Sequence, residues 1–403
     1  MNKNVLLLLT LCFVLFSATA QEPTRWRGPH GNGVYDETGL LKSWPEAGPQ
    51  ILWHFDGLGE GFSSPAFANG KIYLSGMVDG QGYIYALSED GKLLWKAPYG
   101  PEFTESYPGS RSTPVIVGDL LYMYSGLGQV VCMDAATGTV KWKKDVMKEL
   151  GGRNIQWGVT ETLAVDGDKL FVTSGGEEHT VVALNRKTGA LVWSSKALGE
   201  KSAYCAPLVV KLPGRTLLVT LLESHIVGID ANTGKFLWSH EQPNRWSVHS
   251  NTPLYHDGGL FCFSGYGQGG VKLKLSADGS SVTKEWFSKT MDNRIGGAVL
   301  VNGYIYGSGD NNRVWQCIDW KTGEQKYAAT GLAMGTVIYA DGMLYCYTDR
   351  GELALVECTP AGFNIRSKTK VELGTSQHWA HPVIDKGRLF VRHGNTLIVY
   401  KIK

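Results

Sequence analysis

Short runs in which apolar and polar residues alternate recur along the chain, separated by turn sequences rich in Gly, Asn and Asp. Alternation over about four to eight residues is typical of β-strands with one buried face. Clear examples are KIYLSG (71–76), LLYMYSG (120–126), KLFVTSGG (169–176) and MLYCYT (343–348). The stretch 145–150 comes closest to a helical pattern, and it is long enough for only one or two turns. The pattern predicts an all-β protein.

The strand pattern is organised as a repeat that ends in an aromatic residue. Four clear copies are YALSEDGKLLW, VCMDAATGTVKW, VALNRKTGALVW and VGIDANTGKFLW, which end at Trp95, Trp142, Trp193 and Trp238. Weaker copies end at Trp286, Tyr327 and Phe363. Successive aromatics are 47, 51, 45, 48, 41 and 36 residues apart, as these positions give. This spacing is typical of propeller blades and not of a helical solenoid.

Each repeat contains the signals of four strands. A small residue and Pro, as in Ser64-Pro65 or Thr113-Pro114, precede the first strand, and an Asp-x-x-Thr-Gly turn precedes the last. First strands begin near residues 64, 113, 162, 206, 252, 297, 336 and 381, and the eighth repeat stops without a fourth strand. Residues 50–55 (QILWHF) can supply it and hide the open edge. We therefore expect one eight-bladed β-propeller over 50–403, closed by the N-terminal strand completing the last blade.

The N-terminal residues have the features of an export signal. Lys3 is followed by the apolar run 5–16 and by Ala18-Thr19-Ala20, so residues 1–20 are expected to be a cleaved signal peptide. Leu11 precedes Cys12, where a lipoprotein signal has a small residue, and no second apolar stretch follows. We expect a periplasmic or secreted protein without a transmembrane segment. Residues 21–49 contain WRGPHGNGV (26–34), which either covers one end of the channel or packs along the outer blades.

Composition excludes some partners. The chain has 39 Lys and Arg against 37 Asp and Glu, a net charge of +2, which is too weak a basic balance for a nucleic-acid partner. Its remaining cysteines show no CxxC pair and no zinc spacing, and most lie in strand-like contexts. Free core cysteines are therefore favoured over disulfides for Cys132, Cys205, Cys262, Cys317, Cys346 and Cys358.

The ALD-x-x-TG-x-x-x-W units resemble the quinoprotein repeat of bacterial quinone-cofactor alcohol dehydrogenases and of the outer-membrane assembly lipoprotein propeller. WRGPHGNGV, WGVTETLAVDGDKL, SGYGQGG, WAHPVI and LVECTPAGF further resemble exported pyrroloquinoline-quinone-binding-like propellers. The resemblance covers the mature chain and implies the fold. It also implies that Trp95, Trp142, Trp193 and Trp238 dock between neighbouring blades.

The resemblance supports the fold more strongly than it supports quinone catalysis. The quinone enzymes have an adjacent Cys–Cys pair, a Glu/Asn/Asp set that holds Ca²⁺ and an aromatic floor under the cofactor. This chain has no adjacent cysteines, and no residues match the calcium set, although Asp292-Asn293 and Asp310-Asn311 are available. The glycine-rich GYGQGG (265–270) is not followed by a helix and is interpreted as a hairpin connection. No catalytic residue and no metal ligand is assigned. Pyrroloquinoline quinone with Ca²⁺ remains the alternative cofactor.

A ligand site is expected at the mouth of the central channel, where the segments before the inner strands meet. Those segments combine Arg with Trp and Tyr, which suits carboxylated or hydroxylated ligands, and they add His residues that can transfer protons near neutral pH. The alternative is that these side chains only satisfy loop carbonyls. The candidates for ligand binding are Arg111, Arg153, Trp157, Tyr204, Arg245, His249, Asn251, Arg294, His378, Trp379 and His381.

Three functions remain open at this point. The favoured one is an exported binding or scaffold protein that takes a small molecule or glycan at the funnel, or a periplasmic or outer-membrane protein. The second is a periplasmic quinone-dependent alcohol or sugar dehydrogenase. The third is a carbohydrate-active lyase or accessory protein that uses the Arg/His/Tyr funnel. The sequence leaves catalysis open and favours binding.

Overall fold

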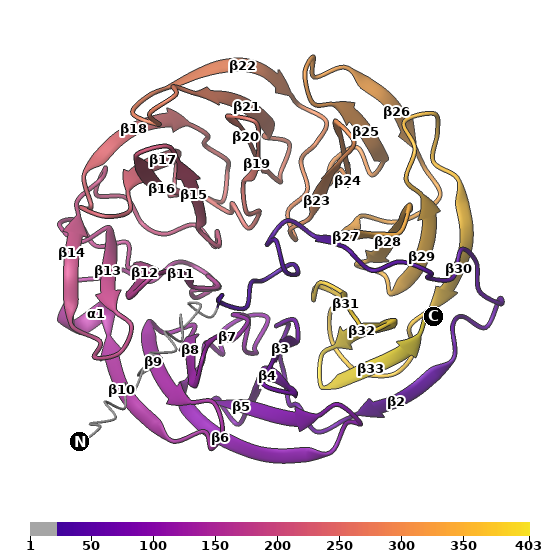
Figure 1. The fold of residues 1–403 in the computed structure, drawn as a ribbon, viewed down its shortest axis with the longest axis horizontal. Coiled ribbons are helices and arrows are strands. Elements are labelled where there is room, and N and C mark those ends of the chain that lie inside the picture. The colour runs from indigo at the N-terminus through magenta and orange to yellow at the C-terminus, as the bar shows by residue number, and fades with distance from the viewer. Residues whose placement is uncertain (1–21) are drawn as a thin grey trace, which may run out of the picture.

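The protein is an eight-bladed β-propeller (Figure 1), described here from a computed structural model that covers residues 22–403. The predicted signal peptide and Cys12 lie outside the described residues. Eight sheets surround a central channel, and the four strands of each blade are antiparallel to their neighbours from the channel to the rim. The predicted fold is therefore confirmed.

The first four blades follow one another along the chain. Blade 1 consists of β3 (Ala66–Ala68), β4 (Lys71–Val78), β5 (Gln81–Ser88) and β6 (Leu93–Pro101). Blade 2 consists of β7 (Val115–Val117), β8 (Leu120–Tyr124), β9 (Gln129–Asp134) and β10 (Val140–Asp145). Blade 3 consists of β11 (Ala164–Asp166), β12 (Lys169–Thr173), β13 (Val181–Asn185) and β14 (Leu191–Ser195). Blade 4 consists of β15 (Leu208–Leu212), β16 (Arg215–Leu221), β17 (His225–Asp230) and β18 (Phe236–Glu241).

The remaining blades continue around the ring. Blade 5 consists of β19 (Leu254–His256), β20 (Gly259–Ser264), β21 (Gly269–Leu275) and β22 (Val282–Ser288). Blade 6 consists of β23 (Ala298–Val301), β24 (Tyr304–Ser308), β25 (Trp315–Asp319) and β26 (Gln325–Ala329). Blade 7 consists of β27 (Gly335–Ala340), β28 (Met343–Thr348), β29 (Glu352–Glu357) and β30 (Ile365–Lys370). Blade 8 contains β31 (Val383–Asp385), β32 (Arg388–His393) and β33 (Thr396–Lys401).

The ring is closed by a strand from the other end of the chain. Strand β2 (Ile51–Phe55) pairs antiparallel with β33 as the outermost strand of blade 8 (Figure 1). The inner strands begin within two residues of the predicted positions. The single helix of the described chain, α1 (Val146–Glu149), falls in the stretch whose pattern comes closest to helical, and its N-cap Asp145 accepts a hydrogen bond from the Lys148 amide. The expected hairpin connection at 265–268 joins β20 to β21.

Tryptophans within the outer strands link neighbouring blades. The Trp193 ring covers Gly234 in the turn of the next blade, where an added Cβ would lie 2.6 Å from the ring, and its Nε1 donates to Ala231 O at 3.1 Å. The same glycine position is covered by Trp53, Trp95, Trp142 and Trp286 in their own next blades. The turn glycine therefore serves two purposes: it adopts the positive φ, +77° at Gly234, and leaves room for the indole.

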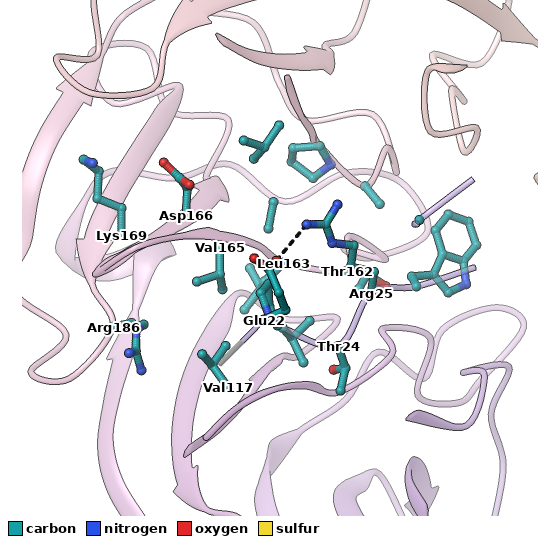
Figure 2. A pocket seen from close by; sticks show the side chains of 18 of the residues that line it. Glu22, Thr24, Arg25, Val117, Thr162, Leu163, Val165, Asp166, Lys169 and Arg186 are labelled. Carbon is teal, nitrogen blue, oxygen red and sulfur yellow. Dashed lines mark hydrogen bonds and ion pairs between the residues drawn. The ribbon is translucent and has the colours of Figure 1, made fainter. Parts of the chain in front are cut away.

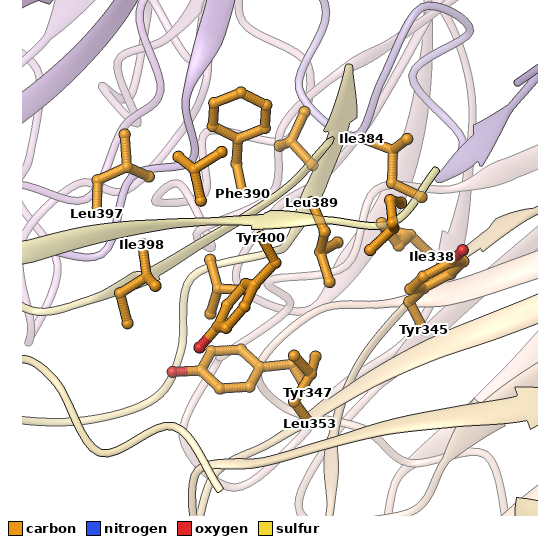
Figure 3. Close-up of a cluster of buried hydrophobic side chains, with 14 of the residues drawn as sticks. Ile338, Tyr345, Tyr347, Leu353, Ile384, Leu389, Phe390, Leu397, Ile398 and Tyr400 are labelled. Carbon is orange, nitrogen blue, oxygen red and sulfur yellow. The ribbon is translucent and has the colours of Figure 1, made fainter. Parts of the chain in front are cut away.

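The largest apolar cluster lies where blades 7 and 8 pack together and the ring closes. Figure 3 shows Leu389 and Tyr400 from blade 8 beside Tyr345, Tyr347 and Leu353 from blade 7. All five side chains are at most 5% exposed. Tyr345 occupies the strand position that the sequence repeats as Tyr73, Tyr122 and Tyr306, and these side chains are buried as well.

The N-terminal segment crosses the central channel and then runs over one face of the ring to the rim (Figure 1). Thr24 pairs with Ile116 of β7, and β1 (Val34–Tyr35) adds in parallel to the inner edge of β27. Farther out, the Leu40 amide donates to Asp341 and the Trp44 amide to Ser367, both in blade 7. Of the two placements open from sequence, residues 26–34 adopt the one that covers the channel.

The cysteines of the described chain are all free. Five are buried, and Cys358 is half-buried directly after β29. Cys205 lies in the loop before β15, outside the strands. Among residues 22–403 no helix has the length and apolarity needed to cross a membrane.

Two buried carboxyl groups lie in surroundings that disfavour their ionised forms. Glu161, 2% exposed just before β11, accepts a hydrogen bond from the Thr173 amide at 3.2 Å, and burial raises its pKa to about 8. Burial also raises the pKa of Glu102 to about 7, although hydrogen bonds from Tyr99 and the Gly126 amide favour its charged form. Because a carboxyl has a pKa of about 4.3 in an unfolded chain, ionisation of either group opposes folding.

The first prediction concerns the indole hydrogen bond between blades. Trp193→Phe should lower the free energy of unfolding by about 1 kcal/mol more than Trp95→Phe, because Trp193 Nε1 donates to the next blade and Trp95 Nε1 has no partner. Urea denaturation followed by circular dichroism measures both values. Equal losses would show that ring packing alone links the blades.

The second prediction concerns pH. The folded-state pKa of Glu161 is raised, so its contribution to stability is full below about pH 4.3 and is lost as the pH rises through about 8. Glu161→Gln should therefore raise the unfolding free energy at pH 9, on the order of 1–3 kcal/mol, and flatten its dependence on pH between 5 and 9. The exposed Glu105 serves as control, and Glu105→Gln should leave the pH profile unchanged. Parallel profiles for wild type and Glu161→Gln would contradict the buried carboxyl as the cause.

Candidate ligand-binding site at the channel mouth

The mouth of the channel is built from one repeated position. In seven blades, the residue four positions before the first residue of the inner strand lines a cavity of about 240 Å³. These residues are Phe62, Arg111, Thr160, Tyr204, Ser250, Arg294 and Trp379. Because the inner strands are related by the ring, side chains at equal offsets converge on the axis. The position therefore acts as a ring of variable residues on a fixed frame.

Aromatic side chains form two walls of this mouth. Trp379 lies 5.0 Å from Phe62 and 5.1 Å from Tyr107 between ring centroids. On another side, Trp157 lies 6.3 Å from Tyr204, whose hydroxyl accepts from the Trp157 amide at 3.2 Å. Flat apolar faces of this kind suit a planar ring or the face of a sugar.

The two arginines of the mouth differ in how many of their N–H groups are already bonded to the protein. Arg111 donates to the backbone carbonyls of Trp157 at 2.5 Å, Tyr107 at 2.7 Å and Ser106 at 3.1 Å, so it mainly holds loops together. Arg294 uses Nε for Asp310 at 3.1 Å and lies beside the Tyr266 side chain, and its Nη1 and Nη2 have no carboxylate or carbonyl partner among the described residues. Burial opposes its charge, but the Asp310 carboxylate outweighs this and raises the pKa of Arg294. Arg294 is therefore a charged donor available to a ligand.

His381 lies at the bottom of the mouth with no polar partner. It is 2% exposed, and the backbone of Ile295 and Gly296 lies beside its ring, yet neither ring nitrogen makes a hydrogen bond of acceptable geometry. Burial and the nearby Arg27 charge hold its pKa well below the ordinary value, so the imidazole is neutral with one donor and one acceptor. Its edge meets Trp26 at 4.8 Å.

The position of His381 is occupied by small residues in other blades. Ser64, Thr113 and Thr162 stand at the same offset, two residues before the inner strand, and link neighbouring blades through their hydroxyls. In blade 8 only the backbone takes part, because the carbonyl of His381 accepts from Ser64 Oγ at 3.0 Å. The imidazole therefore takes no part in these inter-blade bonds; it packs against Trp26 and Gly296 at the cavity that it lines.

Six of the predicted ligand-binding residues line the cavity: Arg111, Trp157, Tyr204, Arg294, Trp379 and His381. His249, predicted to converge with them, is fully buried beneath the wall instead. Its Nδ1 lies 2.6 Å from Ser264 Oγ and its Nε2 3.2 Å from Glu223 O, and burial lowers its pKa to about 4. It connects loops, as the alternative reading of such residues anticipated.

The other four predicted residues also lie off the cavity wall. Asn251 is buried and donates to Phe263 O and Asn293 O. Arg153 donates to Gly175 O, Gly199 O and Glu177 and so braces blade 3 loops. Arg245 stacks on Trp246, and His378 stacks on His393 at 3.7 Å while bonding to Tyr347. A ligand role for these four residues has no support from the cavity geometry.

Several wall residues were absent from the predicted set. Phe62 had a usable signal, since it stands at the same offset before its strand as Arg111 and Trp379. Tyr266 comes from the β20–β21 loop, and Trp26 comes from the N-terminal segment. No repeat pattern points to these two, because only the folded ring brings them to the channel.

The lining does not fit a quinone held by Ca²⁺. Calcium takes six to eight oxygen ligands, largely carboxylates, but no Asp or Glu side chain of the described chain lines the mouth. The nearby Asp310 is paired with Arg294, and Asp292 accepts from three backbone amides. Residues 22–403 also contain no cluster of three His, Cys, Asp or Glu arranged for a metal. What the mouth offers is aromatic faces, one free guanidinium edge and a neutral imidazole.

Solved structures share the fold. The chain superimposes on BamB from Moraxella catarrhalis with a TM-score of 0.63 at 13% identity, covering 88% of this chain and 100% of that one. A europium-containing methanol dehydrogenase gives a TM-score of 0.67 at 15% identity, covering 91% and 88%. At these identities the likeness concerns the fold alone.

Sequence comparison identifies the family. The chain is 25% identical over 209 residues to the outer membrane protein assembly factor BamB of Kangiella koreensis, 51% of this chain and 49% of that protein. It is 29% identical over 140 residues to the quinohemoprotein alcohol dehydrogenase ADH IIB of Pseudomonas putida, 32% and 20% respectively. The chain thus spans about half or less of these relatives. Residues 80–328 match the family model described as outer membrane protein assembly factor BamB, and the chain therefore belongs to this family of quinoprotein-type repeat propellers.

Proposed function

We propose that the protein is a binding propeller of the cell envelope that holds a small, planar or ring-shaped carboxylated ligand at its channel mouth, without redox chemistry. The observation that carries this proposal is the convergence of seven blades on one cavity whose lining combines aromatic faces with the Arg294 guanidinium. His381 lines the same cavity, but its ring nitrogens are buried, so the aromatic faces and Arg294 are the groups that a ligand can contact.

The chemistry of the walls defines the ligand class. Arg294 offers two adjacent N–H groups, the geometry that carboxylates match with paired hydrogen bonds. The faces of Trp157 and Trp379 can contact the ring of the ligand. Thr160 and Ser250 add hydroxyl groups to the wall of the mouth. The cavity of about 240 Å³ limits the bound part to a small ring system.

The dehydrogenase alternative is supported by relatives whose names include quinohemoprotein and quinoprotein alcohol dehydrogenases. It is opposed by the carboxylate-free lining of the mouth. The lyase alternative needs a base next to an open groove, but His381 is buried and the remaining polar groups are hydroxyls and arginines. A protein that binds a ligand without converting it agrees better with the carboxylate-free lining and with the burial of His381.

A scaffold role is the second candidate, and the family itself favours it. The relatives named as assembly factors in Kangiella koreensis, Salmonella typhimurium and Burkholderia pseudomallei suggest an envelope protein as partner. Both roles agree with export through a cleaved signal peptide, which is expected to leave Gln21 as the first residue. Intact-mass analysis of the protein purified from the envelope tests that cleavage.

The third prediction tests ligand binding with three carboxylates of different shape: pyrroloquinoline quinone, 2-naphthoate and galacturonate. We expect at least one to quench tryptophan fluorescence saturably and to raise the melting temperature, equally with and without Ca²⁺. Arg294→Gln should weaken that binding about tenfold or more, because it removes a charged hydrogen-bond donor.

Arg313 provides the matched control, since it is an exposed arginine on a neighbouring loop that does not line the mouth. Arg313→Gln should leave the affinity within twofold. Binding that requires Ca²⁺ would support the dehydrogenase instead. Absence of any response to all three compounds at millimolar concentration would contradict ligand binding and leave the scaffold role.

A further inference from the structure

A second and larger cavity lies in the channel on the other side of the N-terminal segment. It has a volume of about 750 Å³ and is lined by 22–26, by the length of β11 and by β15 (Figure 2). Figure 2 shows Val165, Asp166 and Lys169 along one wall and Thr24, Arg25 and Glu22 along another. Trp26 lines both this cavity and the mouth, so the N-terminal segment separates the two.

The inner strands present backbone hydrogen-bonding groups to this space. In an antiparallel hairpin the residue pairs alternate between bonded and non-bonded, so every second residue directs its N–H and C=O away from its partner strand. In blade 2 that residue is Ile116, one position before the pair Val117–Leu120 that closes the turn. In blade 7 it is Tyr339, one position before the closing pair Ala340–Met343.

The chain itself fills these two edge positions. Thr24 donates its amide to Ile116 O at 2.9 Å, and Thr24 Oγ1 accepts from the Ile116 amide at 2.8 Å. Across the channel, the Tyr339 amide donates to Gly33 O at 2.8 Å. The side chains of β7 are buried in the apolar packing between blades, so Thr24 contacts the strand through its backbone edge. An extended segment lying against an inner edge is thus a binding mode that this protein already uses.

Blades 3 and 4 offer the same edge without an occupant from the described chain. Val165 lies one position before the closing pair Asp166–Lys169, and Val209 lies three positions before the closing pair Leu212–Arg215. Because residues at odd offsets from the closing pair are the non-bonded ones, both valines direct their backbone N–H and C=O to the channel. No hydrogen bond from another described residue reaches these groups. Both residues are half-buried, and both line the larger cavity.

Most charged residues around this cavity are paired with one another, whereas Lys169 donates to Asn232 Oδ1 at 3.2 Å. Lys211 lies 3.4 Å from Asp166, Arg186 lies 3.6 Å from Asp168, and Arg25 lies 3.1 Å from Glu22. The wall between them is formed by small and apolar side chains such as Val115, Val117 and Leu163. The cavity therefore suits an uncharged segment better than an acidic or basic one.

We propose that the larger cavity binds an extended, uncharged peptide segment, which adds to the inner edges of β11 and β15 as Thr24 adds to β7. Affinity comes from backbone hydrogen bonds to Val165 and Val209, and the valine and hydroxyl-bearing wall selects small β-branched side chains. This site is distinct from the mouth and does not depend on the ligand proposed there.

The fourth prediction uses the peptide acetyl-Lys-Thr-Val-Thr-Val-Thr-amide as the probe, with Lys for solubility. Titration calorimetry should show saturable binding, and amide hydrogen exchange should slow at Val165 and Val209. Val165→Pro removes the channel-facing N–H without breaking the β11–β12 ladder, and it should weaken binding about three- to tenfold. A peptide N-methylated at its valines should bind more weakly to the unaltered protein by at least that factor, which tests the backbone contacts without any variant.

Tyr255→Pro is the matched control. Tyr255 is the corresponding middle residue of β19, one position before the closing pair His256–Gly259, and it does not line the cavity. It should leave the affinity within twofold. The proposal is overturned by no binding at millimolar peptide, by equal binding of the N-methylated peptide, by an affinity unchanged in Val165→Pro, or by protection that appears at the rim strands instead of β11 and β15.

Discussion

The contact between an outer-strand tryptophan and the turn glycine of the next blade is the interaction on which the ring depends. Each blade alone is a small sheet that cannot bury both faces. The indole of Trp193 covers Gly234 and donates to Ala231 O, so one side chain provides both apolar burial and a directional bond across the blade boundary. The repeat of this contact fixes the angle between blades, and β2 completes the circle with β33.

A fixed ring converts equal positions in sequence into neighbours in space. The residue four positions before each inner strand reaches the mouth in seven blades, whatever its type. In blades 1 to 3 the residue two positions before the inner strand carries a hydroxyl that links neighbouring blades, and in blade 8 the same position holds His381. Chemistry at the mouth thus arises from substitutions on a frame that the Trp–Gly contacts hold constant.

The N-terminal segment gives the two ends of the channel different properties. Trp26 meets His381 on one side and lines the larger cavity on the other, and Arg27 anchors the segment by donating to Ala298 O and Asn32 O. One end therefore presents aromatic faces and a free guanidinium edge, whereas the other presents strand edges. Two cavities with unlike linings in a single channel follow from where this segment lies.

The sequence by itself determined the number of blades, their boundaries and the closing strand, because alternation, turn residues and the terminal aromatic are local signals repeated in each unit. It also indicated the segments that meet at the mouth, and six of its eleven candidate residues line that cavity.

The sequence did not separate Arg294, whose terminal nitrogens remain available, from Arg111, whose nitrogens hold loop carbonyls, since the same residue type in the same position supports both. His249 failed to reach the cavity because its position is one residue out of phase with the inward-facing one, and Trp26 reached it from outside the repeats. Only the tertiary structure decided these cases, because contacts between residues hundreds of positions apart depend on the closed ring and not on the local pattern.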